Sequence, residues 1–258
     1  GARAADPGVK LAVIMDLDET VIDNAGFESL QIRSGLAYDQ RLWDLWEVHC
    51  TNKVAFIPGA KEFIETANTL NVRVAYISNR GEQFREYTKQ TLAFLGIPLQ
   101  DEQQLQLLKD TSDKTARRAV VEGAYHVLLY VGDNLRDFKD AYKTPSLGKR
   151  TLPELQQGIE ARKNLVDADR QLWGDKFIIL PNPAYGEWQK PLGNGKADLD
   201  LLEVLVGRVA REDGRADVLV ATPRAADHRR RIVVVALGER ALAALEVALL
   251  DAPLRHAH

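Results

Sequence analysis

Short apolar runs recur through the first 180 residues of the chain and are separated by longer stretches of mixed polarity. These runs are nearly continuous rather than alternating, which is typical of strands buried on both faces of a parallel sheet. The predicted strands are LAVIM (11–15), VRVAYI (72–77), the weaker LQLL (105–108), YHVLLYV (125–131) and FIIL (177–180).

The stretches between these strands have helical patterns with recognisable ends. Pro58 stands where a helix begins in PGAKEFIETANTL, and Gly96 and Gly123 close two later helical stretches. Strands that alternate with helices of this length predict right-handed crossovers. We therefore expect an α/β fold, built as a three-layer, Rossmann-like parallel sheet with helices on both faces.

Residues 24–57 interrupt this alternation, because they separate the first strand from its crossover helix by more chain than a simple connection needs. This segment is rich in aromatic side chains: Phe27, Tyr38, Trp43, Trp46 and Phe56. We expect a small helical cap, inserted after the first strand and lying over the sheet.

The composition changes near residue 196. All Phe, Trp and Tyr residues precede this point, whereas nine arginines follow Lys196, the last lysine. We expect one α/β domain over residues 9–196 and a C-terminal extension over 197–258. Two interpretations of the extension stay open: a small appended α/β unit, or an arginine- and alanine-rich segment of different origin.

The overall composition excludes several classes of protein. With 45% hydrophobic residues, 28% charged residues and a net charge of −3, the chain is typical of a globular protein, and we expect no nucleic-acid partner. No apolar run approaches the roughly 18–20 residues of a membrane span. Cys50 is the single cysteine, so no internal disulfide can form. The chain begins GARAADPG rather than with Met, which is compatible with a removed signal peptide.

Candidate chemistry begins where the first predicted strand runs into Asp16 and Asp18. Two like charges at the end of a buried strand repel each other unless a cation or a reacting group shares the site. Further polar residues occupy similar positions after the later strands: Ser78, Asn79 and Arg80, then Lys114, then Asp133 and Asp137. Because ligands bind beyond the carboxyl ends of the strands in open α/β sheets, we expect these segments to converge on one crevice.

Grouped carboxylates suit a hard divalent cation, and Mg²⁺ commonly shares such a site with a substrate phosphate. A hydroxyl and an ammonium, from Ser78 and Lys114, suit the remaining phosphate oxygens. Asp16 can then act as the nucleophile that forms an aspartyl-phosphate. Asp18 can protonate the leaving oxygen and later activate water.

The order of these motifs resembles the haloacid-dehalogenase-like (HAD) phosphatase superfamily: DxDxT after an apolar strand, then Ser, then Lys, then GDxxxD. Longer stretches resemble the class C, or DDDD, acid phosphatases, whose best-known members are bacterial outer-membrane lipoproteins with 5′-nucleotidase activity. They are MDLDETVIDN, IPGA, YISNR, SDKTARR, VGDNLRDF and LPNPAYGEW, and they span about residues 9 to 190. Arg136 departs from this pattern, because it stands where another acid is expected.

The resemblance implies a ligand set and a nucleoside site. The implied Mg²⁺ ligands are Asp16, the carbonyl of Asp18, and Asp133, with Asp137 in the outer shell. The implied phosphate contacts are Ser78, Asn79 and Lys114. The implied substrate contacts are Tyr185, then Trp46 or Trp43 of the cap, and Arg80.

Simpler interpretations of several residues stay open. Lys109 is a rival of Lys114 for the phosphate, and Asp137 can be the N-cap of the following helix. Trp43 and Trp46 lie three residues apart on a predicted helix, a spacing more typical of a core than of a binding platform.

We therefore predict a Mg²⁺-dependent acid phosphatase that hydrolyses small phosphomonoesters, with nucleoside 5′-monophosphates as the expected substrates. A HAD phosphatase for another small phosphomonoester, such as a sugar phosphate, and a non-catalytic surface binding module stay open as alternatives. The resemblance implies a periplasmic or secreted location, with the full-length precursor associated with an outer membrane. A homodimer is compatible with the sequence.

Overall fold

The computed structural model describes residues 8–35, 38–144 and 151–187. All of them belong to the first of the two units into which the chain divides, residues 1–195. The predicted domain boundary near residue 196 and the extension over 197–258 lie outside the described residues.

A five-stranded sheet with the order β5-β4-β1-β6-β7 forms the centre of this unit, and all of its neighbouring strands are parallel. The strands are β1 (Leu11–Met15), β4 (Arg73–Gly81), β5 (Leu105–Leu108), β6 (His126–Gly132) and β7 (Phe177–Ile179). The predicted fold class is thus confirmed, and every predicted strand is present within a few residues of its expected ends.

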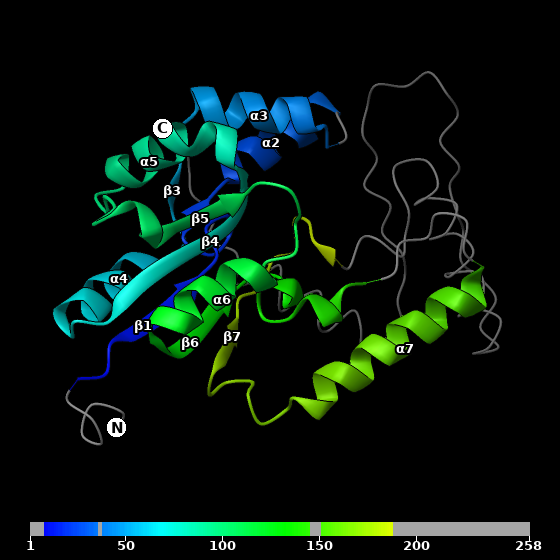
Figure 1. Cartoon of the computed structure of the whole chain (residues 1–258). Coiled ribbons are helices and arrows are strands. Elements are labelled where there is room, and N and C mark those ends of the chain that lie inside the picture. The colour runs from blue at the N-terminus through cyan, green and yellow to red at the C-terminus, as the bar shows by residue number, and fades with distance from the viewer. Residues whose placement is uncertain (1–7, 36–37, 145–150, 188–258) are drawn as a thin grey trace, which may run out of the picture. The chain divides into compact units, whose positions relative to one another are not determined.

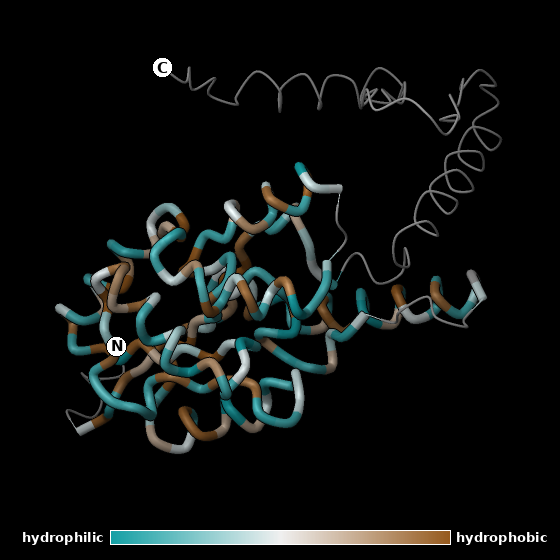
Figure 2. Tube along the Cα trace, turned by 90° about the horizontal axis from the view of Figure 1, so that it is seen from above, coloured by the Kyte–Doolittle hydropathy of each residue, from teal (hydrophilic) through white to brown (hydrophobic). Residues whose placement is uncertain are grey.

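Helices cover both faces of the sheet. One core cluster joins alternate residues of β1 to α4 (Ala60–Thr69) and α5 (Arg85–Phe94). The other joins the intervening residues of β1 to α6 (Thr115–Ala124) and α7 (Leu152–Ala168). Every side chain of β1 is consequently buried, which explains why its sequence is continuously apolar. Hydrophobic and hydrophilic stretches follow one another along the described chain (Figure 2), as expected where elements bury one side and expose the other.

The cap consists of α2 (Ala25–Ser34) and α3 (Gln40–His49), which lie together above the carboxyl ends of the strands (Figure 1). A short antiparallel pair, β2 (Ile22–Asp23) and β3 (Ala55–Phe56), forms its base. The expected helical cap after the first strand is therefore present.

Four short 3₁₀ turns complete the described part: η1 (Glu82–Phe84), η2 (Glu102–Gln104), η3 (Leu135–Asp137) and η4 (Asp140–Tyr142). Helix α7 has no counterpart among the predicted elements. It begins at a capping box, in which the Thr151 backbone and hydroxyl both donate to the Glu154 carboxylate, at 2.7 and 3.0 Å. Across the described residues, no helix combines the length and apolar character that a membrane crossing needs.

Candidate active site

A cavity of about 770 Å³ opens at the carboxyl ends of β1, β4 and β6, beneath the cap. The predicted site residues that line it are Asp16, Asp18, Trp43, Ser78, Asn79, Arg80, Lys114, Asp133, Asp137 and Tyr185. The expected convergence of distant segments is therefore present. Lys114 is 4% exposed within this cavity, whereas its rival Lys109 is a surface residue.

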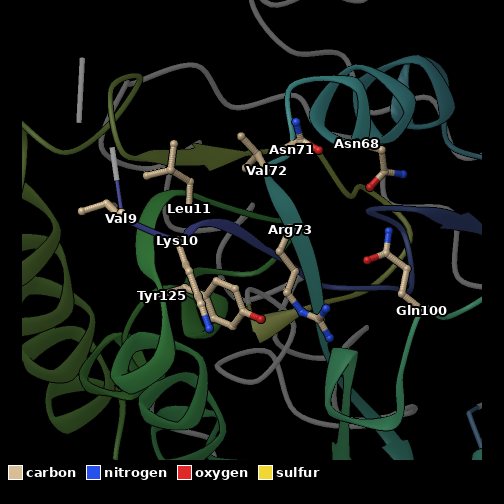
Figure 3. Close-up of a pocket in the computed structure, with 10 residues that line it drawn as sticks. Val9, Lys10, Leu11, Asn68, Asn71, Val72, Arg73, Gln100 and Tyr125 are labelled. Carbon is tan, nitrogen blue, oxygen red and sulfur yellow. The ribbon is translucent and has the colours of Figure 1, made fainter. Parts of the chain in front are cut away.

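A second cavity, of about 520 Å³, lies at the opposite, amino end of the strands (Figure 3). Lys10, Asn68 and Tyr125 are among the residues that line it. Its Arg73 guanidinium lies over the Tyr125 ring, 5.6 Å from the centroid, and is ion-paired with Asp101 at 2.5 Å. This cavity contains none of the predicted site residues.

Three carboxylates form a cluster at the floor of the first cavity. One oxygen each from Asp16, Asp133 and Asp137 lies within 4.8 Å of the other two, an arrangement that could hold a metal ion. The Lys114 ammonium donates to Asp16 at 2.6 Å and to Asp137 at 2.7 Å. The cluster therefore unites the end of β1, the turn after β6 and the residue that caps α6.

The electrostatics of this cluster favour a cation. Burial raises the pKa of Asp16 well above its ordinary value, and Asp137 and Asp133 raise it further, against the opposing effect of Lys114. Burial and the neighbouring Asp137 raise the pKa of Asp133 to about 7. Burial alone would lower the pKa of Lys114, but Asp137 and Asp16 outweigh it and the pKa is raised. One ammonium thus leaves the acids under-compensated, and a divalent cation bound to these oxygens would relieve their repulsion.

The GDNLRD motif shapes the turn that presents Asp133 and Asp137. In its capping box, the Asn134 backbone donates to the Asp137 carboxylate at 2.9 Å, while the Asn134 side chain accepts from Arg136 at 3.1 Å. A Cβ atom at Gly132 would collide with the Asp137 carboxylate, so glycine is required there. Asn182 orients Asp133 by donating to its carboxylate at 2.8 Å.

Asp18 has partners of its own. Arg80 donates from Nη2 to Asp18 Oδ1 at 2.7 Å and from Nε to both oxygens, at 3.0 and 3.1 Å. Asn24 donates to Oδ1 at 2.9 Å, and the Ser78 hydroxyl lies 3.4 Å from Oδ2. The buried Arg80 guanidinium thus holds the Asp18 carboxylate at the edge of the cavity, and the direct contact of Arg80 with a substrate stays a prediction.

Two arginines of α6 hold the walls of the site. Arg117 donates to the carbonyl of Ser78 at 2.5 Å and to the side chain of Asn79 at 2.8 Å. Arg118 donates to the carbonyl of Asp137 at 3.1 Å. Sequence reasoning did not single out this pair, although their three- and four-residue spacing from Lys114 places all three on one side of the helix.

The cap contributes an apolar roof. Phe27, Tyr38 and Trp43 line the cavity, and the Arg80 guanidinium lies 5.7 Å from the centre of the Trp43 ring. Trp46 is 8% exposed and is absent from the described lining of the cavity. Its indole donates instead to Asn24 at 3.0 Å, so of the two predicted tryptophans Trp43 is the one that lines the cavity, and its stacking on a base stays a prediction.

Tyr185 closes the side of the cavity, and its hydroxyl donates to the Glu19 carboxylate. Burial and the nearby Asp18 raise the pKa of Glu19 to about 7, while the hydrogen bond from Tyr185 acts in the opposite direction. Glu19 has a positive φ of 54°, a strained conformation for a residue with a side chain. The Glu19–Tyr185 contact was not apparent from the sequence, because 166 positions separate the two residues.

Comparisons with known proteins agree with this geometry. The family model described as HAD superfamily, subfamily IIIB (acid phosphatase) matches residues 2–188. The class C acid phosphatase from Bacillus anthracis with tungstate bound is 28% identical, with 82% of each chain covered and a TM-score of 0.65. Another structure of the class C acid phosphatase from Bacillus anthracis is 28% identical, with 81% of each chain covered and a TM-score of 0.60.

Proposed function

The chain belongs to the acid phosphatases of HAD subfamily IIIB, and we propose that Asp16 is the nucleophile of its reaction. The family and the similar solved structures identify a phosphoric monoester hydrolase whose substrates are small phosphomonoesters. The observation that carries the proposal is the position of Asp16: its carboxylate lies against Lys114 and within 4.8 Å of Asp133 and Asp137 oxygens.

We assign a Mg²⁺ site to the same cluster. Its carboxylate donors would be Asp16 and Asp133, with Asp137 beside them, and such oxygens suit a hard cation. The raised pKa values of Asp16 and Asp133 reflect charge that a cation would neutralise. When bound, the cation offsets the repulsion between these acids and the negative charge of the phosphoryl oxygens. The carbonyl of Asp18 and the outer-shell role of Asp137 remain predictions.

In the first step, an Asp16 oxygen attacks phosphorus and the bond to the ester oxygen breaks, leaving an aspartyl-phosphate. Asp18, protonated at Oδ2, gives its proton to the departing oxygen, so the alcohol leaves neutral. Lys114 and Ser78 donate hydrogen bonds to the phosphoryl oxygens.

In the second step, Asp18 Oδ2 takes a proton from water, whose oxygen attacks phosphorus. The bond between phosphorus and the Asp16 oxygen then breaks, inorganic phosphate leaves, and Asp16 is again a free carboxylate. Asp18 has regained the proton that it gave away, so the cycle closes.

We propose nucleoside 5′-monophosphates as the preferred substrates. The support is the apolar roof formed by Phe27, Tyr38 and Trp43, with Tyr185 beside it, because aromatic faces stack on bases. A sugar phosphate has no such face to offer, so it is the weaker candidate. A periplasmic or secreted location is also proposed, on family resemblance alone, and cell fractionation of the source organism tests it.

A phosphate-release screen over nucleotides and sugar phosphates, with Mg²⁺ and with EDTA, tests these assignments. We expect turnover with Mg²⁺, loss of turnover in EDTA, and a higher kcat/KM for nucleoside monophosphates than for sugar phosphates. Undiminished turnover in EDTA would exclude the metal site, and equal kcat/KM values would exclude the nucleotide preference. Tungstate should compete with substrate, since an acid phosphatase of similar structure binds it.

A further inference from the structure

One buried side chain, Asn24, connects the cap to Asp18. The Trp46 indole donates to Asn24 Oδ1 at 3.0 Å, and Asn24 Nδ2 donates to Asp18 Oδ1 at 2.9 Å. We propose that Trp46 is a positioning residue of the reaction, which acts through Asn24 to fix the general acid and base, Asp18. This inference rests on the function proposed for Asp18 and adds a role for the cap.

The Trp46 indole determines which way the Asn24 amide faces. An indole N–H can only donate, so it requires the carbonyl oxygen of the amide and turns the NH₂ group toward Asp18. Asn24 is fully buried, at 0% exposed, so water does not offer an alternative partner for either end of the amide. The Asn24 backbone N–H is also held, by the Glu19 carboxylate at 3.0 Å.

This orientation distinguishes the two oxygens of Asp18. Oδ1 accepts from Asn24 and from Arg80 Nη2, at 2.9 and 2.7 Å. Oδ2 has the longer contacts, 3.1 Å to Arg80 Nε and 3.4 Å to the Ser78 hydroxyl. Arg80 Nε also donates to Oδ1, at 3.0 Å, so Oδ1 is occupied by three donor groups and Oδ2 is the oxygen available to exchange a proton with the leaving group and with water.

The Trp46 ring is itself fixed within the cap. It packs against Phe27, with ring centroids 5.8 Å apart. Gly26 makes room for it, because a Cβ atom at position 26 would come within 2.8 Å of Trp46 Cη2. The placement of α3 is therefore coupled to Asp18 through the rigid Trp46 ring and the Asn24 amide.

Trp46→Phe removes the N–H and keeps a ring. The Asn24 carbonyl then loses its donor, and the amide can turn its oxygen toward Asp18, where an acceptor repels the carboxylate instead of holding it. General acid catalysis matters most when the leaving oxygen is strongly basic, so the loss should depend on the leaving group. A purely structural role would lower the rate for all esters equally.

The test compares kcat/KM for phenyl phosphate and p-nitrophenyl phosphate, whose leaving phenols differ in basicity but little in size. We expect Trp46→Phe to lower kcat/KM about 10- to 100-fold for phenyl phosphate and several-fold less for p-nitrophenyl phosphate. Trp173→Phe is the matched control, because its indole donates to the Val166 carbonyl at 3.2 Å outside the site. It should change neither value.

Equal losses for the two esters in Trp46→Phe, or no loss, would overturn the proposal. If Trp46→Phe fails to fold, the double variant Trp46→Phe/Asn24→Leu removes both polar groups together and should show the same dependence on the leaving group. In a double-mutant cycle, Trp46→Phe should add little to the effect of Asn24→Leu; additive effects would refute the relay. A wild-type protein that hydrolyses neither ester would instead refute the proposed function.

Discussion

The metal-free protein should lose stability as the pH rises, because its acid cluster ionises against burial and repulsion. Burial and Asp137 raise the pKa of Asp133 from 3.8 to about 7, and burial also raises that of Asp16. Between about pH 4 and pH 7, the native state therefore binds more protons than the unfolded state. The free energy of unfolding must then fall with rising pH, until Asp133 is ionised in both states.

The size of this effect follows from the shift at Asp133. A rise of about 3 pKa units corresponds to about 4 kcal/mol, and relaxation and water penetration reduce this to roughly 2–4 kcal/mol. About two thirds of that loss falls between pH 5 and pH 7.5, so for a protein of this size Tm falls by about 3–10 °C over this interval. Mg²⁺ bound to the ionised acids should cancel most of this loss of stability, because the ion stabilises the ionised carboxylates, whose burial destabilises the metal-free protein.

Thermal unfolding followed by circular dichroism, in EDTA and in Mg²⁺, measures this difference. The increase in Tm on adding Mg²⁺ should be small near pH 5 and reach about 3–10 °C near pH 7.5. Asp133→Asn should abolish the increase.

Glu47→Gln is the control for this experiment. Burial raises the pKa of Glu47 to about 7 as well, against the effect of Arg80, but Glu47 lies outside the acid cluster. Its replacement should flatten the pH dependence equally with and without Mg²⁺ and leave the Mg²⁺ effect intact. A Mg²⁺ effect that is the same at pH 5 and pH 7.5 would refute the reasoning.

Three further outcomes are expected from substitutions. Asp16→Asn should lower kcat for p-nitrophenyl phosphate by at least about 10³-fold while the circular dichroism spectrum stays that of the folded protein, because an amide cannot form the phosphoenzyme. Tyr185→Ala should raise KM for a nucleoside monophosphate about 10-fold but KM for phenyl phosphate little, in steady-state assays, since a stacking contact is worth about 1–3 kcal/mol. Arg118→Met should weaken activation by Mg²⁺ about 10-fold in a metal titration, because Arg118 holds the Asp137 carbonyl at 3.1 Å, whereas Arg162→Met, which removes a 2.8 Å bond to a carbonyl outside the site, should not.

The sequence predicted the elements and residues whose signals are local. Continuous apolar runs indicated the five strands, because a parallel sheet buries both faces of each strand. Asp16, Asp133 and Lys114 could be grouped because parallel strands end at one edge of the sheet. Helix α7 escaped prediction since only Leu155 among its described side chains is buried, and its apolar periodicity is correspondingly weak.

The partners of individual side chains could not be predicted in this way. Trp43 and Trp46 have similar surroundings in the sequence, and only the packing of α3 decides that one lines the cavity while the other reaches Asn24. Arg80 lies beside the predicted Ser78, but its direction depends on Asp18, which is 62 positions away. Such choices depend on tertiary contacts between distant segments, which periodicity and spacing do not contain.

The two acids that follow the first strand can lie close together because each is paired with a different basic side chain. Leu17 between them is fully buried, so alternation along the extended chain turns Asp16 and Asp18 toward the cavity. Lys114 contacts Asp16 as a compact point charge, which can exchange a carboxylate for a phosphate oxygen. Arg80 holds Asp18 through several hydrogen bonds from a planar group that stays charged.

This division leaves a charge balance that fits the proposed ligands. When all four are ionised, the carboxylates of Asp16, Asp18, Asp133 and Asp137 exceed the two cations that contact them, Lys114 and Arg80, by two charges, which one divalent ion would neutralise. Arg117 and Arg118 add two positive charges behind the walls of the site, where they bind carbonyl and side-chain oxygens. A phosphomonoester dianion carries two negative charges, opposite to those of the two arginines. The proposed metal and the proposed substrate would therefore each meet groups of opposite charge in the same cavity.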